Sequence, residues 1–294
     1  MKFLVRSLLT LVLLPIFPAC SADPLPPGTK SFRDLAYVKE PHFRQKLDLY
    51  VPEKPTGPLL VYIHGGGWRG GTKDHVQALP MVKFGYCVAS VEYRFSQDAI
   101  FPAQIEDCKA AIRWLRAHAA EYGYDPKRVA VCGDSAGGHL TALLATTGQV
   151  RDFDVGENLE QTSEVQCAVD FYGPTDFIDF RPASDNPAVQ PKGKESLLTY
   201  LFGGEVSERQ ELARKASPIY WASKTTAPLL ILHGTKDQLV GVDQSQRFAE
   251  KLKAEGAEVT LDVIEGAGHG GAEFWAEGRG ERFFEFLKQH LAVK

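Results

Sequence analysis

The chain has little cysteine and no excess of basic residues. Its 294 residues include 5 cysteines, and its formal net charge is −4. A chain with this charge offers no basic field to a phosphate backbone, so we expect no nucleic-acid partner. It also lacks a Cys-x-x-Cys pair and the Cys/His spacings typical of zinc, so the sequence predicts no metal site. Neither an internal repeat nor a linker marks a second folded domain.

Long hydrophobic runs are missing as well, and the one apolar stretch near the start is short. Residues 8–17 are mostly apolar, Lys2 and Arg6 precede them, and small residues follow at 19–22. This run is too short for a membrane-spanning helix, and the three-part pattern is typical of a secretory signal peptide. We therefore expect residues 1–22 to direct export, with the mature protein periplasmic, secreted or lipid-anchored to the cell envelope.

Two routes of signal processing fit the residues around position 20. Cys20 resembles the lipid-modified cysteine of bacterial lipoproteins, although Phe17 stands where that signal usually carries Leu. Alternatively, a general signal peptidase cuts after Ala22. The proline-rich residues 23–30 are then expected to form an extended tether.

The four cysteines beyond Cys20 leave open whether the protein has a disulfide. An exported protein meets an oxidising environment, in which disulfides form. Cys87, Cys132 and Cys167, however, sit inside apolar strand-like runs, where cysteine behaves as a small buried hydrophobic residue. Cys108 falls on the apolar face of a predicted helix.

From about residue 31 onward, strand-like and helix-like segments alternate. This alternation is typical of an α/β protein whose mostly parallel sheet is covered by helices on both faces. We predict one domain over residues 31–294. The expected strands are 34–39, 46–51, 58–64, 86–91, 128–132, 165–171, 228–233 and 258–264, and the expected helices are 74–84, 102–121, 138–146, 243–255 and 276–290.

Residues 175–223 interrupt this alternation. They contain several prolines and two short helical patterns, and they are longer than a normal connection between two strands. We therefore predict a small cap-like insertion over the carboxyl edge of the sheet.

The most informative motif is Gly133-Asp134-Ser135-Ala136-Gly137-Gly138, which directly follows an apolar strand-like run. A strand that ends in Gly-x-Ser-x-Gly and turns sharply into a helix exposes one serine hydroxyl above the sheet. The flanking glycines allow the tight turn. We predict that Ser135 is a catalytic nucleophile.

A serine nucleophile needs a base, and the base needs a carboxylate to orient it. In this class of fold the chain order is Ser, then Asp or Glu, then His. Asp237 follows the predicted strand 228–233, and His269, flanked by glycines, follows the strand 258–264. We predict that Asp237 and His269 complete the site at the edge where Ser135 lies.

An acyl-transfer site must also stabilise an oxyanion. His64-Gly65-Gly66-Gly67-Trp68 follows the third predicted strand, and the backbone N–H groups of Gly66, Gly67 and Ala136 are the predicted donors. His64 is expected to fix this loop. No Gly-Lys-Ser/Thr follows the glycines, which argues against a phosphate-binding loop, and no cofactor is predicted.

Two further residues are predicted to contact the substrate. Trp68 ends the glycine loop, and His139 lies one turn into the helix that follows Ser135. Both are therefore expected near the reacting ester. For His139, however, the sequence favours a structural capping role over a place in the pocket wall.

These motifs together resemble the α/β-hydrolase superfamily, in the branch of hormone-sensitive-lipase-like esterases that carry His-Gly-Gly-Gly and Gly-Asp-Ser-Ala-Gly-Gly. Tyr93-Arg94 and the run from Phe101 to Asp107 resemble bacterial feruloyl or acetylxylan esterases. The resemblance implies an α/β-hydrolase fold with an eight-stranded, mostly parallel sheet. It also implies ester hydrolysis through an acyl-enzyme, with Ser135 attacking and His269 acting as base and then acid.

We therefore expect a serine carboxylesterase that acts on short acyl or aromatic esters, including those on plant polysaccharides. A peptidase of the same fold is the first alternative, although the chain shows no added domain for gripping a peptide terminus. A non-catalytic carbohydrate- or envelope-binding protein is the second, although such proteins usually lose a catalytic residue and none is missing here. The acyl group, the alcohol and the oligomeric state are not fixed by the sequence.

Overall fold

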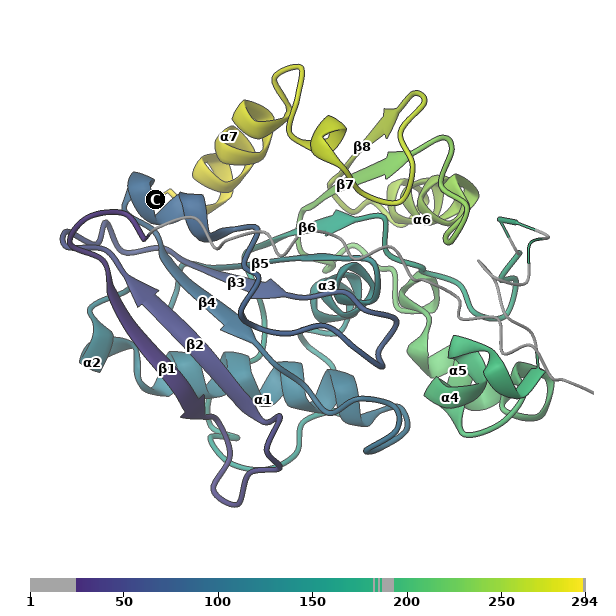
Figure 1. The fold of residues 1–294 in the computed structure, drawn as a ribbon, viewed down its shortest axis with the longest axis horizontal. Helices are drawn as coiled ribbons and strands as arrows, with labels where there is room; N and C mark the ends of the chain where they lie inside the picture. Colours follow the sequence, from purple (N-terminus) through teal and green to yellow (C-terminus); the bar gives the residue numbers. More distant parts are fainter. Residues whose placement is uncertain (1–24, 182, 185, 187–192, 293–294) are drawn as a thin grey trace, which may run out of the picture.

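One eight-stranded sheet runs through the computed structural model, which describes residues 25–181, 183–184, 186 and 193–292. Its strand order is β1-β2-β4-β3-β5-β6-β7-β8 (Figure 1). The β1–β2 and β2–β4 pairs are antiparallel, and every pair from β4 to β8 across the sheet is parallel. The strands are β1 (Lys30–Ala36), β2 (Lys46–Val51), β3 (Leu59–Ile63), β4 (Cys87–Val91), β5 (Val129–Asp134), β6 (Cys167–Phe171), β7 (Leu229–Gly234) and β8 (Val259–Ile264).

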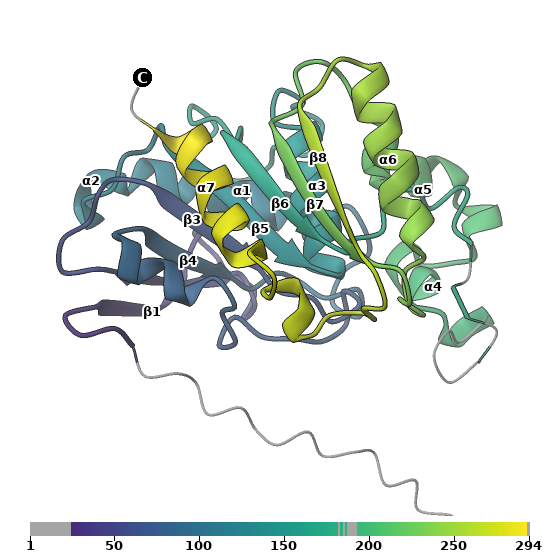
Figure 2. The same cartoon turned by 90° about the horizontal axis from the view of Figure 1, so that it is seen from above.

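Helices cover both faces of this sheet. The helices α1 (Ala103–Ala117), α3 (Ala136–Thr146) and α6 (Val242–Ala254) place their buried side chains in one hydrophobic core layer. On the other face, α7 (Arg279–Leu291) and the 3-10 helix η1 (Leu79–Phe84) contribute to the second layer. Figure 2 shows α7 lying across the sheet on the side opposite α1 and α3. This is the layered α/β arrangement that the alternating sequence pattern predicts.

The hydrophobic runs explain which strands lie at the centre. Every residue of β3, β4, β6 and β7 is buried, as expected for parallel strands with helices on both faces. β1 is instead largely exposed, because it lies at the edge of the sheet.

Three predicted elements differ from the structure. The first strand begins earlier than expected, because β1 pairs from Lys30 with Val51 and contains an irregularity between Phe32 and Leu35. The helix expected over 74–84 is reduced to η1, which has a proline in its first turn. The long helix expected over 102–121 is divided at His118 into α1 and α2 (Ala119–Tyr122).

The segment between β6 and β7 folds into short helices. It contains η2 (Gly193–Glu195), α4 (Leu197–Phe202), η3 (Val206–Glu208), α5 (Gln210–Ala216) and η4 (Pro218–Tyr220). Leu201 and Phe202 of α4 are buried, and the N–H of Phe101 donates to the carbonyl of Leu201 at 2.9 Å. α4 is therefore anchored on the main domain, beside the loops that leave β3 and β4 (Figure 1).

The cysteines of the described region form no disulfide. Cys87, Cys108, Cys132 and Cys167 are all buried and free. Burial raises the pKa of each of these thiols. The structure thus favours the buried hydrophobic role for all four.

Residues 1–24, which include Cys20 and the predicted signal peptide, lie outside the described residues. Among the residues described, no helix is long and apolar enough to cross a membrane.

Candidate active site

Ser135 sits on a strained turn between β5 and α3. Its backbone has φ 54° and ψ −117°, which few residues other than glycine adopt. The carbonyl of Phe171 at the end of β6 accepts the N–H of Ser135 at 2.8 Å and holds the turn. This is the geometry that the Gly-x-Ser-x-Gly motif predicts, since it lifts the hydroxyl out of the sheet.

The glycines of the motif are required by close backbone contacts. A Cβ at Gly137 would lie 2.0 Å from the carbonyl oxygen of Ile63, and a Cβ at Gly133 would lie 2.6 Å from the same atom. A Cβ at Gly138 would lie 2.4 Å from Oδ1 of Asp170. Any side chain at these positions would push α3 away from the sheet and displace Ser135.

His269 connects Ser135 to Asp237. The Nε2 atom of His269 lies 2.8 Å from Oγ of Ser135, and its Nδ1 atom lies 2.6 Å from Oδ2 of Asp237. Because an ionised carboxylate only accepts hydrogen bonds, Nδ1 carries the proton and Nε2 is free to accept the serine hydroxyl. The structure therefore brings the three predicted residues together in the order Asp237–His269–Ser135.

The carboxylate of Asp237 is buried and fully satisfied. Its Oδ1 accepts the N–H groups of Leu239 and Val240 at 2.8 and 2.9 Å. Burial alone would raise the pKa of this carboxyl group, but the hydrogen bonds from His233 and His269, together with the N–H of Val240, hold the pKa well below its usual range. Asp237 is thus ionised at neutral pH and fixes the orientation of His269.

His233 supports the turn that carries Asp237. Its Nε2 donates to the carbonyl of Val240 at 2.8 Å, and its Nδ1 lies 2.7 Å from Oγ of Ser245. The side chain is fully buried on β7. It therefore ties the 237–240 turn to α6 as well as to the strand.

The glycine loop after β3 faces Ser135. Gly66 and Gly67 have φ values of 110° and 60°, and both line the same cavity as Ser135. Their N–H groups have no backbone acceptor within the described part of the chain. The N–H of Ala136, the first residue of α3, also lacks an intrahelical acceptor. These are the three donors expected for an oxyanion.

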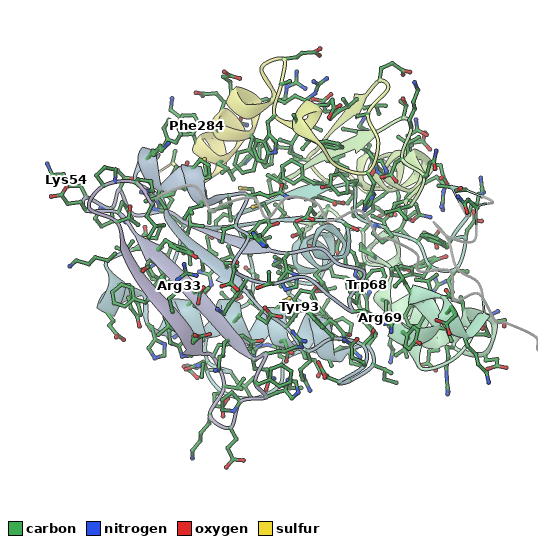
Figure 3. All side chains as sticks on the ribbon, viewed as in Figure 1. Arg33, Lys54, Trp68, Arg69, Tyr93 and Phe284 are labelled. Atoms are coloured by element: carbon green, nitrogen blue, oxygen red, sulfur yellow. The ribbon has the colours of Figure 1, made fainter. Side chains whose placement is uncertain are left out.

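Residues below this loop fix its position. The Oη of Tyr93 donates to the carbonyl of His64 at 3.0 Å, and the two rings stack with centroids 4.7 Å apart. The Nδ1 of His64 donates to the carbonyl of Gly65 at 2.7 Å, and the N–H of Ser96 donates to the carbonyl of Trp68 at 2.8 Å. His64 is therefore held inside the loop and does not contact Ser135. Figure 3 shows Trp68 and Arg69 beside the α4 segment, with Tyr93 farther toward the sheet.

Asp134 is a site residue that the sequence reasoning missed. It accepts the hydroxyl of Tyr62 at 2.5 Å, and it also accepts the N–H of Gly65. Burial raises the pKa of its carboxyl group, although these hydrogen bonds oppose the shift. Asp134 thus links the turn at Ser135 to the glycine loop after β3. The signal for it lay inside the motif, as the residue immediately before Ser135.

A cavity of about 660 Å³ opens above these residues. Its walls come from the glycine loop after β3, from the turns after β6 and β7, and from the segment between β6 and β7. Most of the lining is apolar, as in sites that bind small organic ligands. The residues that line it are Gly66, Gly67, Trp68, Asp134, Ser135, Tyr172, Pro174, Phe180, Gly193, Ser196, Leu197, Leu198, Thr199, Glu205, Val206, Leu239, Val240 and His269.

The two predicted substrate contacts have different positions. Trp68 lines the cavity, although its side chain is largely buried. His139 is fully buried and does not line the cavity, so the prediction that it contacts the substrate directly is not met. Its Nδ1 accepts the indole N–H of Trp68 at 3.1 Å, and its Nε2 donates to the carbonyl of Ala216 at 2.7 Å. His139 lies behind Trp68 and fixes the indole ring.

An α/β-hydrolase fold is defined by three features together: the mostly parallel sheet, the turn at Ser135 after β5 and the position of His269 after β8. The chain belongs to the BD-FAE family, because the family model of that description matches residues 47–252. Sequence relatives include the probable carboxylic ester hydrolase LipM of Mycobacterium tuberculosis, which is 35% identical over 67% of this chain and 45% of its own length. Esterase LipC of the same organism is 29% identical over 81% of this chain and 59% of its own length. The chain thus spans about half the length of the curated relatives it matches.

A solved structure agrees over the whole domain. A truncated form of a carbohydrate esterase from gut microbiota superimposes with a TM-score of 0.81 and 28% identity. The match covers 90% of this chain and 97% of that one. The predicted fold class and the predicted family resemblance are both confirmed.

The buried position of His139 predicts a pH-dependent loss of stability. Burial, opposed by the hydrogen bond to Ala216, lowers the pKa of this imidazole from 6.5 to about 4. The unfolded chain therefore takes up this proton at a higher pH than the folded chain. The contribution of neutral His139 to the free energy of unfolding is thus complete above pH 6.5 and is lost as the pH falls toward 4. The whole change corresponds to about 3 kcal/mol.

Urea unfolding of the wild type and His139→Gln at several pH values between 7 and 4 measures this contribution. Carboxyl groups elsewhere titrate in both proteins, so only the difference between their unfolding free energies matters. Between pH 7 and pH 4, we expect the free energy of unfolding of the wild type to fall by about 3 kcal/mol relative to that of His139→Gln. A difference that stays constant with pH would show that His139 does not titrate as its burial requires.

Proposed function

We propose that this protein is a serine carboxylesterase. The observation that carries the proposal is the chain of hydrogen bonds from Asp237 through His269 to Ser135, which ends in a mostly apolar cavity. The relatives named as carboxylic ester hydrolase and esterase support the same reaction.

The geometry supplies each step of ester hydrolysis. Oγ of Ser135 attacks the ester carbonyl carbon while its proton passes to Nε2 of His269, and Asp237 stabilises the imidazolium that forms. The carbonyl oxygen becomes an oxyanion and takes hydrogen bonds from the N–H groups of Gly66, Gly67 and Ala136. The C–O bond then breaks, and His269 gives its proton to the departing alcohol. Water, activated by His269, hydrolyses the acyl-enzyme in the same way.

Loss of the nucleophile tests this reaction. Ser135→Ala should abolish turnover of p-nitrophenyl acetate and labelling by a fluorophosphonate probe, because the variant lacks the hydroxyl that His269 contacts and that forms the acyl-enzyme. The variant should unfold at the same temperature as the wild type or slightly higher, since among the described residues the hydroxyl makes a single hydrogen bond, to His269. A variant with full turnover would refute the proposal.

We further propose that the substrates are short acyl or aromatic esters, including ester groups on plant polysaccharides. The cavity volume suits a small acyl group. The likeness to a truncated carbohydrate esterase supports an ester carried by a sugar. The segment between β6 and β7 contributes much of the cavity wall, so it contains the residues that select the substrate.

A panel of acetylated xylan, feruloylated sugar and simple acyl esters tests the substrate class. We expect release of acetate or ferulate from the polymer as well as turnover of the small esters, because a carbohydrate esterase must accept the sugar as its alcohol. Hydrolysis of small esters alone would remove the polysaccharide part of the proposal. A peptide amide hydrolysed faster than any ester would instead identify a peptidase.

We also propose that residues 1–22 direct export. The positively charged start, the short apolar run and the small residues at 19–22 support it. The intact mass of the mature protein, expressed with its own signal in a bacterium, decides between the two processing routes. A chain that begins at a lipid-modified Cys20 indicates an envelope anchor, and one that begins at Asp23 indicates general signal peptidase. An uncleaved chain retained in the cytoplasm would refute export.

A further inference from the structure

Tyr172, which the sequence reasoning did not identify, lies in a strained turn beside the active site. It follows β6 directly and precedes Gly173-Pro174. Its backbone φ is 47°, a value that a residue with a bulky aromatic side chain rarely adopts. Such a conformation persists only where the surrounding structure enforces it, and it is most common at functional sites.

Two backbone–backbone hydrogen bonds and one from a backbone N–H to a side chain enforce this turn. The N–H of Tyr172 donates to the carbonyl of Leu232 at 2.8 Å, and the N–H of Gly173 donates to Oδ1 of Asp170 at 2.8 Å. On its other side, the carbonyl of Phe171 accepts the N–H of Ser135. The turn that bears Tyr172 therefore also holds the backbone of Ser135.

Asp170 is placed in the core to make this turn. Its side chain is fully buried, and burial raises the pKa of its carboxyl group to about 6 despite the hydrogen bond from Gly173. A Cβ at Gly138 or at Gly173 would lie within 2.6 Å of Oδ1. Two glycines and a buried carboxylate are thus arranged around one turn, which a simple connection from β6 would not require.

The result of this strain is the position of the Tyr172 ring. Its centroid lies 4.6 Å from that of the His269 imidazole, with the planes inclined at 59°, and 4.8 Å from that of Phe274. The phenol hydroxyl lies close to the side chain of Gln77. The ring is therefore fixed between Phe274 and the imidazole, and it forms part of the cavity wall.

We propose that Tyr172 is a positioning residue for His269, whose aromatic ring holds the imidazole against Ser135 and stabilises its protonated form. This inference rests on the proposed function, because His269 becomes an imidazolium only when it takes the proton from Oγ of Ser135. A cation within about 6 Å of an aromatic centroid is attracted by the ring's quadrupole.

The charged and titratable groups around His269 determine how large this effect is. The carboxylates of Asp237 and Asp134 both interact favourably with its positive charge, and Ser135 contacts Nε2. Burial raises the pKa of the Tyr172 phenol well above its ordinary value, so the ring remains neutral throughout the working range. Its contribution is therefore that of a π system, and loss of that contribution should lower kcat by about 2- to 30-fold.

Replacing the ring without changing its size tests the proposal. We would compare Tyr172→Phe with the same position occupied by 3,4,5-trifluorophenylalanine, which keeps the shape but removes most of the negative charge from the ring face. Tyr172→Leu removes the ring. The measurements are kcat and KM for p-nitrophenyl acetate from pH 5 to 9, expressed per site that reacts with a fluorophosphonate, so that unfolded protein does not count.

We expect Tyr172→Phe to keep most of the wild-type kcat. The trifluorinated protein should show a kcat at least about 2-fold below that of Tyr172→Phe, a KM within about 2-fold, and a lower apparent pKa for the base in the kcat/KM profile. Tyr172→Leu should lower kcat at least as much. As a matched control, 3,4,5-trifluorophenylalanine at Phe283, an aromatic residue of α7 that packs on Phe171 and Trp275, should leave kcat unchanged.

Equal kcat values and pH profiles for Tyr172→Phe and the trifluorinated protein would overturn the proposal, as would a loss confined to KM. Failure of the proposed function looks different. In that case the wild type itself would neither hydrolyse the ester nor react with the fluorophosphonate.

Discussion

The active site depends on the close approach of α3 to the strands on which it rests. A Cβ at Gly137 would overlap the carbonyl oxygen of Ile63, so only glycine permits this contact. The same approach places Ser135 at the end of β5, within reach of the loops that follow β3, β6 and β8. The loops after β3 and β8 bring the glycine donors and His269 to the serine, and the turn after β7 brings Asp237 to His269.

Much of the fold could be predicted because its signals are local. The buried strands are short apolar runs, and the helices carry the expected periodicity, so the alternation alone indicates the layered sheet. The predictions were wrong where contacts with a distant part of the chain determine where an element begins or ends. β1 begins at Lys30 because β2 offers a partner there, at Val51, and this pairing is not visible in the segment itself. The helix near residue 80 is reduced to η1, which ends at Phe84 with Gly85 as its C-cap.

The site was predictable to the extent that its residues belong to motifs with a fixed spacing. Ser135, Asp237 and His269 follow strands in a known order, and the glycine loop follows another. Asp134, Tyr172 and His233 escaped notice because their roles come from contacts that the motifs do not encode, namely Tyr62–Asp134, Tyr172–His269 and His233–Asp237. His139 was misplaced for a related reason. Its position one turn into α3 brings it near Ser135 along the chain, yet that face of the helix points to Trp68 and Ala216.

The turns of the active site and the cavity wall from α4 are held in place in different ways. Ser135, Trp68 and Tyr172 all have positive φ, and each of these turns is fixed by backbone hydrogen bonds to neighbouring strands or loops. The hydrogen bond from the N–H of Ser135 to the carbonyl of Phe171 joins the turns at Ser135 and Tyr172, so a change in one of them would displace the other. The cavity wall from α4 is different, since Leu197 and Leu198 reach the cavity as side chains of a short surface helix. Under the proposed function, substitutions at Leu197 or Leu198 would alter the shape of the cavity, whereas substitutions in the turns at Ser135 and Tyr172 would displace the catalytic residues themselves.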